Sequence, residues 1–199
     1  MHCRPVLPSR LRVHAAALSL SLLAACGGGG GSDDAAPAGG GGAPAPGGGS
    51  SAGADVTCGL ANFDSDALRL INQHRAAGAI CGSRGSFAPT SALSAQAQLT
   101  SAAHGHSRDM ADNNYFSHAS LDGRSPGTRV TAAGYSWSSV GENIAAGYGS
   151  VQAVVDGWMA SDGHCANLMN PGFTQYGLAC ARNDASTYRL YWTLNLARP

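Results

Sequence analysis

Two histidines and one glutamate have the side chains that metal binding or acid–base chemistry needs. His118 lies in a Phe-Ser-His motif, Glu142 in Gly-Glu-Asn and His164 in Gly-His-Cys. Neutral imidazoles bind transition metals, and a nearby carboxylate can act as a ligand, as an orienting group or as a base toward bound water. Loop histidines are poor core material, so we interpret the three as a functional cavity. The alternative is a hydrogen-bonded cluster that only fixes the loops.

Longer motifs surround these three residues. They comprise residues 115–126, Gly134-Tyr135, residues 141–144 and the Trp158–Cys165 stretch. Together they resemble the bacterial branch of the CAP superfamily, the secreted domain shared by cysteine-rich secretory proteins, antigen-five venom proteins and plant pathogenesis-related proteins. The resemblance covers about residues 58–197 and implies an α-β-α sandwich. Because that fold hosts binding, signalling and enzymatic roles, function must be argued from the site.

The resemblance also implies how the candidate residues are arranged. In the family, two histidines and two acidic residues face one another in a central cavity, and His118, Glu142 and His164 match three of these positions. Glu142 is the only glutamate in the chain, so the fourth position has no glutamate. The weaker candidates with polar side chains are Asn143, Asp156, Ser161 and Asp162. We expect a divalent metal, zinc before others, to bind weakly here because the ligand set is incomplete.

Three classes of function remain open. The first is a binding module for a small-molecule, lipid or glycan ligand, or for a metal. The second is a hydrolase, either metal-assisted or using Ser117 as a nucleophile with a histidine and Glu142. The third is a structural or interaction domain. The chain contains neither Gly-x-Ser-x-Gly nor His-Glu-x-x-His, and Ser117 and His118 would point apart on an extended backbone. We therefore expect binding, and not a conventional enzyme.

The first 56 residues have the composition of an export signal and a tether. Residues 1–25 combine early arginines with an apolar run over 13–23, which predicts a signal peptide. The run ends in Leu23-Ala24-Ala25-Cys26, which resembles a lipobox, so Cys26 is the expected lipidated N-terminus; an ordinary cleaved signal is the alternative. Residues 26–56, rich in Gly, Ala, Pro and Ser, predict a flexible tether. Gly27, rather than aspartate, after the cysteine favours the outer membrane in a Gram-negative cell.

Residues 57–199 are long enough for one domain. The chain has 12 basic and 12 acidic residues, so its formal net charge is zero. That balance gives no support to a nucleic-acid partner. We expect a monomer whose contact with the membrane is made through the N-terminal lipid.

Four cysteines remain in the domain once Cys3 and Cys26 are set aside. They permit three disulfide connectivities. Cys58 and Cys81 bracket the first expected helix, and Cys165 and Cys180 bracket the segment before the last hairpin. This favours the local pairs Cys58–Cys81 and Cys165–Cys180. Zinc ligation is the alternative, but no Cys-x-x-Cys pair exists and the expected compartment is oxidising.

Periodicity predicts an α+β fold. We expect helices from Asp64 or Ser65 to Ala77, from about Ser94 to Asn113, from Pro126 to before Gly134, and after a Ser150 cap. His106 lies on the inward stripe of the second helix and is interpreted as a hydrogen-bonded core histidine. Alternating residues predict a half-buried strand at 190–196, and residues 176–182 can pair with it across the turn at 183–186. A third strand is expected at about 140–146. The three strands form a small antiparallel sheet between helices on both sides, stapled by disulfides.

Overall fold

The computed structural model describes residues 55–199. The predicted signal peptide, Cys26 and nearly all of the predicted tether lie outside the described residues. The helices and strands follow one another as α1 (Phe63–Ala77), β1 (Ala79–Ile80), the 3-10 turn η1 (Gly82–Arg84), β2 (Ser86–Phe87), β3 (Ser94–Ala95), α2 (Ala97–Asp112), α3 (Pro126–Ala132), β4 (Ser139–Ala146), α4 (Val151–Met159), α5 (Asp162–Met169), β5 (Gln175–Arg182) and β6 (Leu190–Arg198).

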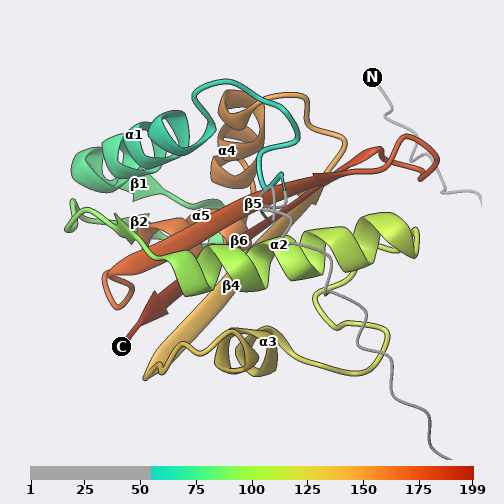
Figure 1. Cartoon of the computed structure of the whole chain (residues 1–199). Coiled ribbons are helices and arrows are strands. Elements are labelled where there is room, and N and C mark those ends of the chain that lie inside the picture. The colour runs from blue at the N-terminus through green and yellow to red at the C-terminus, as the bar shows by residue number, and fades with distance from the viewer. Residues whose placement is uncertain (1–54) are drawn as a thin grey trace, which may run out of the picture. The chain divides into compact units, whose positions relative to one another are not determined.

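The main sheet has four strands in the order β3-β5-β6-β4. β6 pairs antiparallel with both β5 and β4, and the two-residue strand β3 adds a parallel pairing to β5. Helices α1 and α4 lie on one side of this sheet, and α2 and α3 lie on the other (Figure 1). The predicted sandwich of helices around a small sheet is therefore confirmed.

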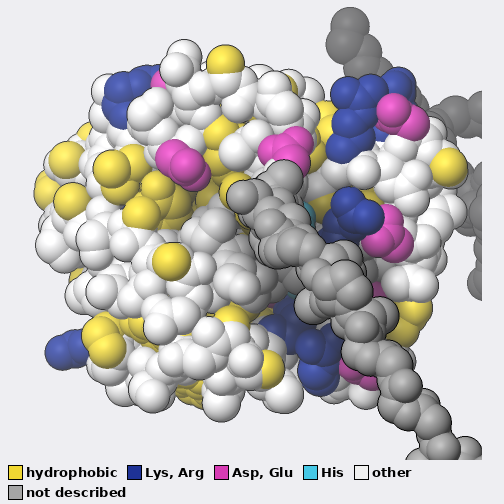
Figure 2. Space-filling model, in the orientation of Figure 1, with side chains coloured by type: hydrophobic (Ala, Val, Ile, Leu, Met, Phe, Trp, Pro, Cys, Tyr) yellow, Lys and Arg dark blue, Asp and Glu magenta, His cyan; other side chains and the backbone are white. Residues whose placement is uncertain are grey.

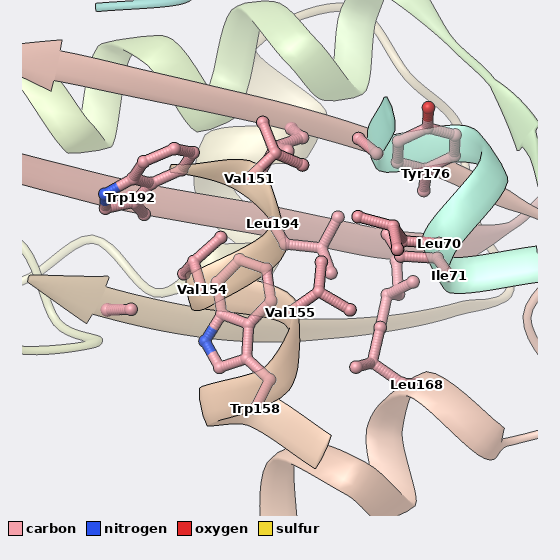
Figure 3. Packing of buried hydrophobic residues seen from close by; sticks show 14 of the residues in the cluster. Leu70, Ile71, Val151, Val154, Val155, Trp158, Leu168, Tyr176, Trp192 and Leu194 are labelled. Carbon is pink, nitrogen blue, oxygen red and sulfur yellow. The ribbon is translucent and has the colours of Figure 1, made fainter. Parts of the chain in front are cut away.

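The larger core lies between the sheet and the α1–α4 layer. Trp192 and Leu194 of β6 face the apolar side of α4, as Figure 3 shows. That side consists of Val151, Val154, Val155 and Trp158, the stripe expected from the spacing after Ser150. The indole of Trp158 also donates to the Ile144 carbonyl of β4 at 3.2 Å, which ties the helix to the edge strand.

The opposite face of β6 is also buried, which the sequence does not predict. Thr193 and Asn195 alternate with the leucines, so the pattern indicated a half-buried strand, yet both are covered by α2. Ser107 of α2 donates to Thr193 Oγ1 at 2.8 Å, and Asn195 Nδ2 donates to the Leu99 carbonyl at 3.2 Å. The alternation of side chains along β6 therefore distinguishes two buried faces, one that is apolar and one whose side chains form hydrogen bonds with α2.

Two helix starts match the prediction because a serine side chain caps each helix. Ser125 Oγ accepts from the Thr128 amide at 3.2 Å, and Ser150 Oγ accepts from the Ala153 amide at 3.1 Å. α1 instead begins at Phe63 after an uncapped Asn62, and α2 begins only at Ala97 because Ser94–Ala95 pairs with β5. α5 is an additional helix that the sequence analysis does not predict.

The predicted pairs Cys58–Cys81 and Cys165–Cys180 are wrong. The disulfides join Cys58 to Cys180 and Cys81 to Cys165. The 15-residue helix α1 separates Cys58 from Cys81, and a helix of that length spans about 22 Å, far beyond disulfide reach. Thr57 instead lies beside Cys180 of β5, and Cys81 packs against α5. Since all four sulfurs are bonded, the zinc alternative for these cysteines also fails.

Candidate functional site

Glu142 is the centre of the candidate site. It lies on β4 opposite Asn195 of β6, and its side chain is only 2% exposed. One carboxylate oxygen lies 2.8 Å from His118 Nδ1, and the other accepts from Arg129 Nη2 at 2.6 Å. Both oxygens therefore have partners from two different segments of the chain.

Arg129 supplies the positive charge beside this glutamate. It projects from α3, and its side chain is 4% exposed. Its Nη1 donates to the carbonyls of His118 and Arg124 at 3.0 Å each and to Ser120 Oγ at 3.1 Å. One guanidinium thus fixes both the carboxylate and the loop that carries His118. The sequence analysis does not single out Arg129, because its burial depends on how α3 packs against β4.

His118 has one nitrogen held and one nitrogen left for a ligand. A carboxylate only accepts hydrogen bonds, so Nδ1 carries the proton toward Glu142, and in the neutral form of the ring the lone pair lies on Nε2. The His118 side chain is 53% exposed, in contrast to its buried partner. This carboxylate–histidine arrangement is the one that orients imidazole ligands in metal sites.

His164 reaches the site from α5. Burial lowers the pKa of its imidazole below the ordinary value of 6.5, and repulsion from the His118 ring lowers it further. Asn143 Nδ2 donates to the His164 carbonyl at 3.1 Å, while Asn167 Nδ2 donates to Asn143 Oδ1 at 2.9 Å. Asn143 therefore ties α5 to β4 and holds His164 near Glu142. The lowered pKa favours the neutral imidazole of His164, which is the form that binds metals.

The other candidates for the fourth position lie in different places. Ser161 and His164 both line one groove, whose walls include parts of β4 and α4. Asp162 is turned toward η1, where its Oδ2 accepts from the Ser83 amide at 2.9 Å and from the Ser83 hydroxyl at 2.6 Å. Asp156 is exposed on α4 and accepts from Gln152 at 2.9 Å. Only the serine is therefore positioned to contribute beside His164.

A groove of about 330 Å³ adjoins His164. Residues 144–146 of β4, together with Gly157 and Trp158 of α4, form part of its lining. Three aromatic side chains from separate loops complete it, and these are Phe116, Tyr148 and Tyr188. His164 therefore lies in the wall of a largely apolar groove of the size that binds small molecules.

The donor set limits what metal could be held. Within residues 55–199, no group of three or more His, Cys, Asp or Glu side chains is arranged to hold an ion. The imidazoles of His118 and His164 remain as the two candidate nitrogen ligands, and they lie near enough for the His118 ring to lower the pKa of His164. Both Glu142 oxygens are engaged, so of its three possible roles the geometry supports the orienting one.

Ser117 lacks the surroundings of an activated nucleophile. Its Oγ accepts from the Ala119 amide at 3.1 Å, and among the described residues no imidazole hydrogen-bonds to it. Its carbonyl accepts from His106 Nε2 at 2.9 Å. His106 is fully buried, which confirms the interpretation of a hydrogen-bonded core histidine. A nucleophile needs a base within hydrogen-bond reach, and the described residues place none at Ser117.

Comparison with known proteins identifies the family. Residues 68–196 match the model of the CAP family, described as the cysteine-rich secretory protein family. That match spans more than half of the chain, so the protein belongs to this family. Its two disulfides are typical of a domain exported to an oxidising, extracellular environment.

Relatives match the chain over shorter stretches. The uncharacterized protein YkwD of Bacillus subtilis is 42% identical over 80 residues, which is 40% of this chain and 31% of the relative. The uncharacterized membrane protein YlbC of the same organism is 38% identical over 96 residues, covering 48% of this chain and 26% of the relative. The matched stretches thus span less than a third of either relative.

Two solved structures are similar to the chain, and the second of them has the same fold. An extracellular SCP-domain protein from Bacillus anthracis has 36% identity and a TM-score of 0.49, with 55% of this chain and 35% of that chain covered. An outer surface protein from Borrelia burgdorferi has 18% identity and a TM-score of 0.52, with 67% and 87% covered. In residues 55–199 of the present chain, no helix combines the length and apolarity needed to cross a bilayer.

Proposed function

We propose that this protein is an exported binding module in which His118 and His164 together take a divalent transition metal or a ligand bridged by one. The observation that carries the proposal is the double engagement of Glu142. With one oxygen on His118 Nδ1 and the other on Arg129, the carboxylate orients the imidazole and leaves Nε2 free. A cluster that only stabilised loops would have no need for a half-exposed imidazole.

The proposed site binds metal less tightly than a zinc enzyme does. Catalytic zinc normally has three protein ligands and a water, whereas this site offers two imidazoles. Zinc or copper suits such nitrogen ligands best. A metal held here would act as a Lewis acid toward an oxygen or nitrogen of the ligand. The protein's own contribution is to keep His164 neutral and to hold His118 in one orientation.

Binding is favoured over hydrolysis by the surroundings of Ser117. Its hydroxyl accepts from a backbone amide, and the histidine nearest to it in the hydrogen-bond network contacts its carbonyl. Both arrangements serve loop structure, so neither supplies a base for catalysis.

The proposal includes a location at the cell envelope. Lipidation of Cys26 would anchor the chain, and residues 26–56 would hold the domain away from the lipid surface. In a Gram-negative cell, Gly27 after the cysteine favours the outer membrane. Figure 2 shows few charged side chains on the visible face, with basic and acidic groups lying mostly beside one another. That mosaic gives no support to a nucleic-acid partner.

Calorimetric titration of zinc tests the metal site. Wild type should bind, and His118→Ala and His164→Ala should each weaken binding at least about tenfold, since each removes one of two ligands. Glu142→Gln should weaken it by about 10–100-fold, as loss of an orienting partner does. His74→Ala on α1 is the matched control and should bind like wild type.

The pH dependence separates ligation from nonspecific binding. Because neutral imidazole is the ligand, affinity should fall between about pH 7.5 and about pH 5.5, on either side of the unperturbed value of about 6.5. Equal binding by wild type and both histidine variants would refute the shared site. Absence of binding in all variants would favour the purely structural cluster.

A further inference from the structure

Three aromatic side chains around the groove beside His164 are left partly open to solvent. Phe116 is 46% exposed, Tyr188 is 47% exposed and Tyr148 is 37% exposed. The first two rings meet edge to face with centroids 6.1 Å apart, and Tyr188 also packs against the buried Tyr191 at 5.8 Å. Large aromatic side chains normally bury most of their area, so a set that stays open beside a hollow indicates a binding surface.

Tyr148 packs against a glycine in helix α4, a residue type that is unfavourable inside a helix. Gly157 lies in the interior of α4, where glycine costs about 0.5–1 kcal/mol relative to alanine. A Cβ at Gly157 would lie 2.7 Å from Tyr148 Cζ and 2.9 Å from Cε1, so the phenol ring lies directly against the helix backbone. Trp192 Nε1 donates to the Tyr148 carbonyl at 3.0 Å and fixes its backbone. The glycine therefore makes room for the aromatic wall.

The lining of the groove is neutral and carries hydroxyl groups. Lys, Arg, Asp and Glu are absent from its described lining. The polar groups are the Ser161 hydroxyl, the His164 imidazole and the phenols of Tyr148 and Tyr188. A carboxylate or phosphate would lose hydration without gaining a charged partner here. The lining therefore suits a neutral ligand that has both apolar faces and hydroxyl groups.

We propose that this groove binds a neutral glycan. A sugar ring presents C–H groups on its faces, which stack on aromatic rings, and hydroxyls at its edge, which pair with Ser161, His164 and the tyrosine phenols. A fatty acyl chain would leave those polar groups unpaired and would gain most from a closed apolar cavity, whereas these aromatic rings are open to water. The inference rests on the proposed binding role of the His118–His164 site, but does not require the metal.

Glycan binding is measured with two neutral probes, chitotetraose and cellotetraose, added to the purified protein with and without a chelator. Trp158 lines the groove, so tryptophan fluorescence reports occupancy, and calorimetry gives the affinity. Tyr188→Ala and Tyr148→Ala should each weaken binding about tenfold, which corresponds to about 1.4 kcal/mol. Tyr188→Phe should retain most of the affinity lost in Tyr188→Ala, because the ring remains.

Gly157→Ala tests the proposed architecture of the groove. The added methyl group should displace Tyr148 and weaken glycan binding at least about tenfold, while zinc binding at the histidines persists. Gly105→Ala is the matched control, since it lies inside helix α2 and its Cβ would meet no atom within 4 Å. It should bind like wild type. If Gly157→Ala fails to fold, the Tyr188→Ala variant still tests the groove, because Tyr188 is half-exposed and its replacement leaves the core intact.

The outcomes separate the two proposals. Glycan binding without zinc binding would remove the metal from the proposed function and leave the glycan groove supported. Zinc binding with no response to either oligosaccharide would overturn the glycan inference alone. Laurate binding that Tyr148→Ala abolishes would also overturn it, in favour of an acyl chain. Glycan binding unchanged in Tyr148→Ala and Tyr188→Ala would place the ligand elsewhere and refute the assignment.

Discussion

Arg129 Nη2 and Glu142 Oε2 lie 2.6 Å apart in an ion pair whose side chains are 4% and 2% exposed. Every other Arg–carboxylate pair in residues 55–199 has both partners at least 40% exposed. A charge without its partner is costly in a buried place, so each residue of this pair depends on the other. The pair connects α3 to β4, and both of its residues also contact His118.

Removal of Arg129 should therefore destabilise the whole domain. Arg129→Ala should lower the free energy of unfolding by about 3–5 kcal/mol, since it removes the buried counter-ion of Glu142 and leaves the carboxylate with only its His118 contact. Urea denaturation measures the effect. Arg108→Ala, which breaks an exposed pair with Asp112, is the control and should cost less than about 1 kcal/mol. Similar losses in both variants would contradict the buried-pair interpretation.

The double replacement Arg129→Met with Glu142→Leu provides a further check. Removing both charges and filling the space with apolar side chains should restore part of the lost stability. The same variant should bind zinc weakly, because His118 loses its orienting partner. Recovery of stability together with unchanged zinc affinity would show that the pair does not position His118.

Local features of the fold could be predicted from the sequence. Ser125 and Ser150 cap their helices because the cap depends on a few neighbouring residues. The β5–β6 hairpin follows from the alternation in β6 and from the short polar turn that precedes it. His118 and Glu142 could be paired only through the family motifs, since 24 residues separate them.

Features that depend on tertiary packing could not be predicted. The disulfide partners follow from where the ends of α1 lie, because residues that bracket a helix are separated by its length. Arg129 is buried because α3 packs against β4. Neither the sequence of α3 nor that of β4 indicates this packing. The sequence does not predict α5 because Gly163 and Asn167 weaken its helical signal, whereas in the structure its Cys165 is held by the disulfide to Cys81.

Loss of the Cys81–Cys165 disulfide should destabilise the domain without changing its fold. The bond joins segments 84 residues apart and should contribute about 2–5 kcal/mol. Cys81→Ala with Cys165→Ala should lower the melting temperature while the far-ultraviolet circular dichroism spectrum stays unchanged. Peptide mapping of unreduced wild type should recover Cys58 linked to Cys180. A peptide containing Cys58 linked to Cys81 would contradict the structure.

Gly177 sets how closely α2 approaches the sheet. A Cβ at this position would collide with the Thr100 amide and the Leu99 carbonyl carbon, and would lie 2.7 Å from Leu99 Cβ. Because backbone cannot yield as a side-chain tip does, Gly177→Ala should cost at least about 1–3 kcal/mol by urea denaturation. Gly105→Ala on α2 meets no atom within 4 Å and should be neutral or slightly stabilising. Equal stability of the two variants would refute the close approach.

Lipid anchoring at Cys26 predicts a labelling result. A metabolic fatty-acid analogue should label the wild-type protein and leave Cys26→Ala unlabelled, because that cysteine is the acceptor expected from the Leu23-Ala24-Ala25-Cys26 motif. Cys3→Ala is the control, and it should retain the label. Label that persists in Cys26→Ala would contradict the anchor.

Acidification should destabilise the domain through the buried His106 and the partly buried His164. Burial is the main cause that lowers the pKa of both His106 and His164 below 6.5. Above about pH 6.5 these groups are neutral in both the folded and the unfolded chain, so they add no pH dependence. As the pH falls below that value, the unfolded chain takes up protons that the folded chain refuses. Stability should then drop by up to about 1.4 kcal/mol per pH unit for each group.

His106→Gln isolates the more buried of these two histidines. Glutamine cannot titrate, yet its amide can still donate to the Ser117 carbonyl that His106 Nε2 contacts. Urea denaturation at about pH 7.5 and about pH 5.5 should therefore show a smaller loss of stability in this variant than in wild type. His106→Gln with His164→Gln should reduce the loss further. The same loss in wild type and in both variants would show that other groups cause the acid sensitivity.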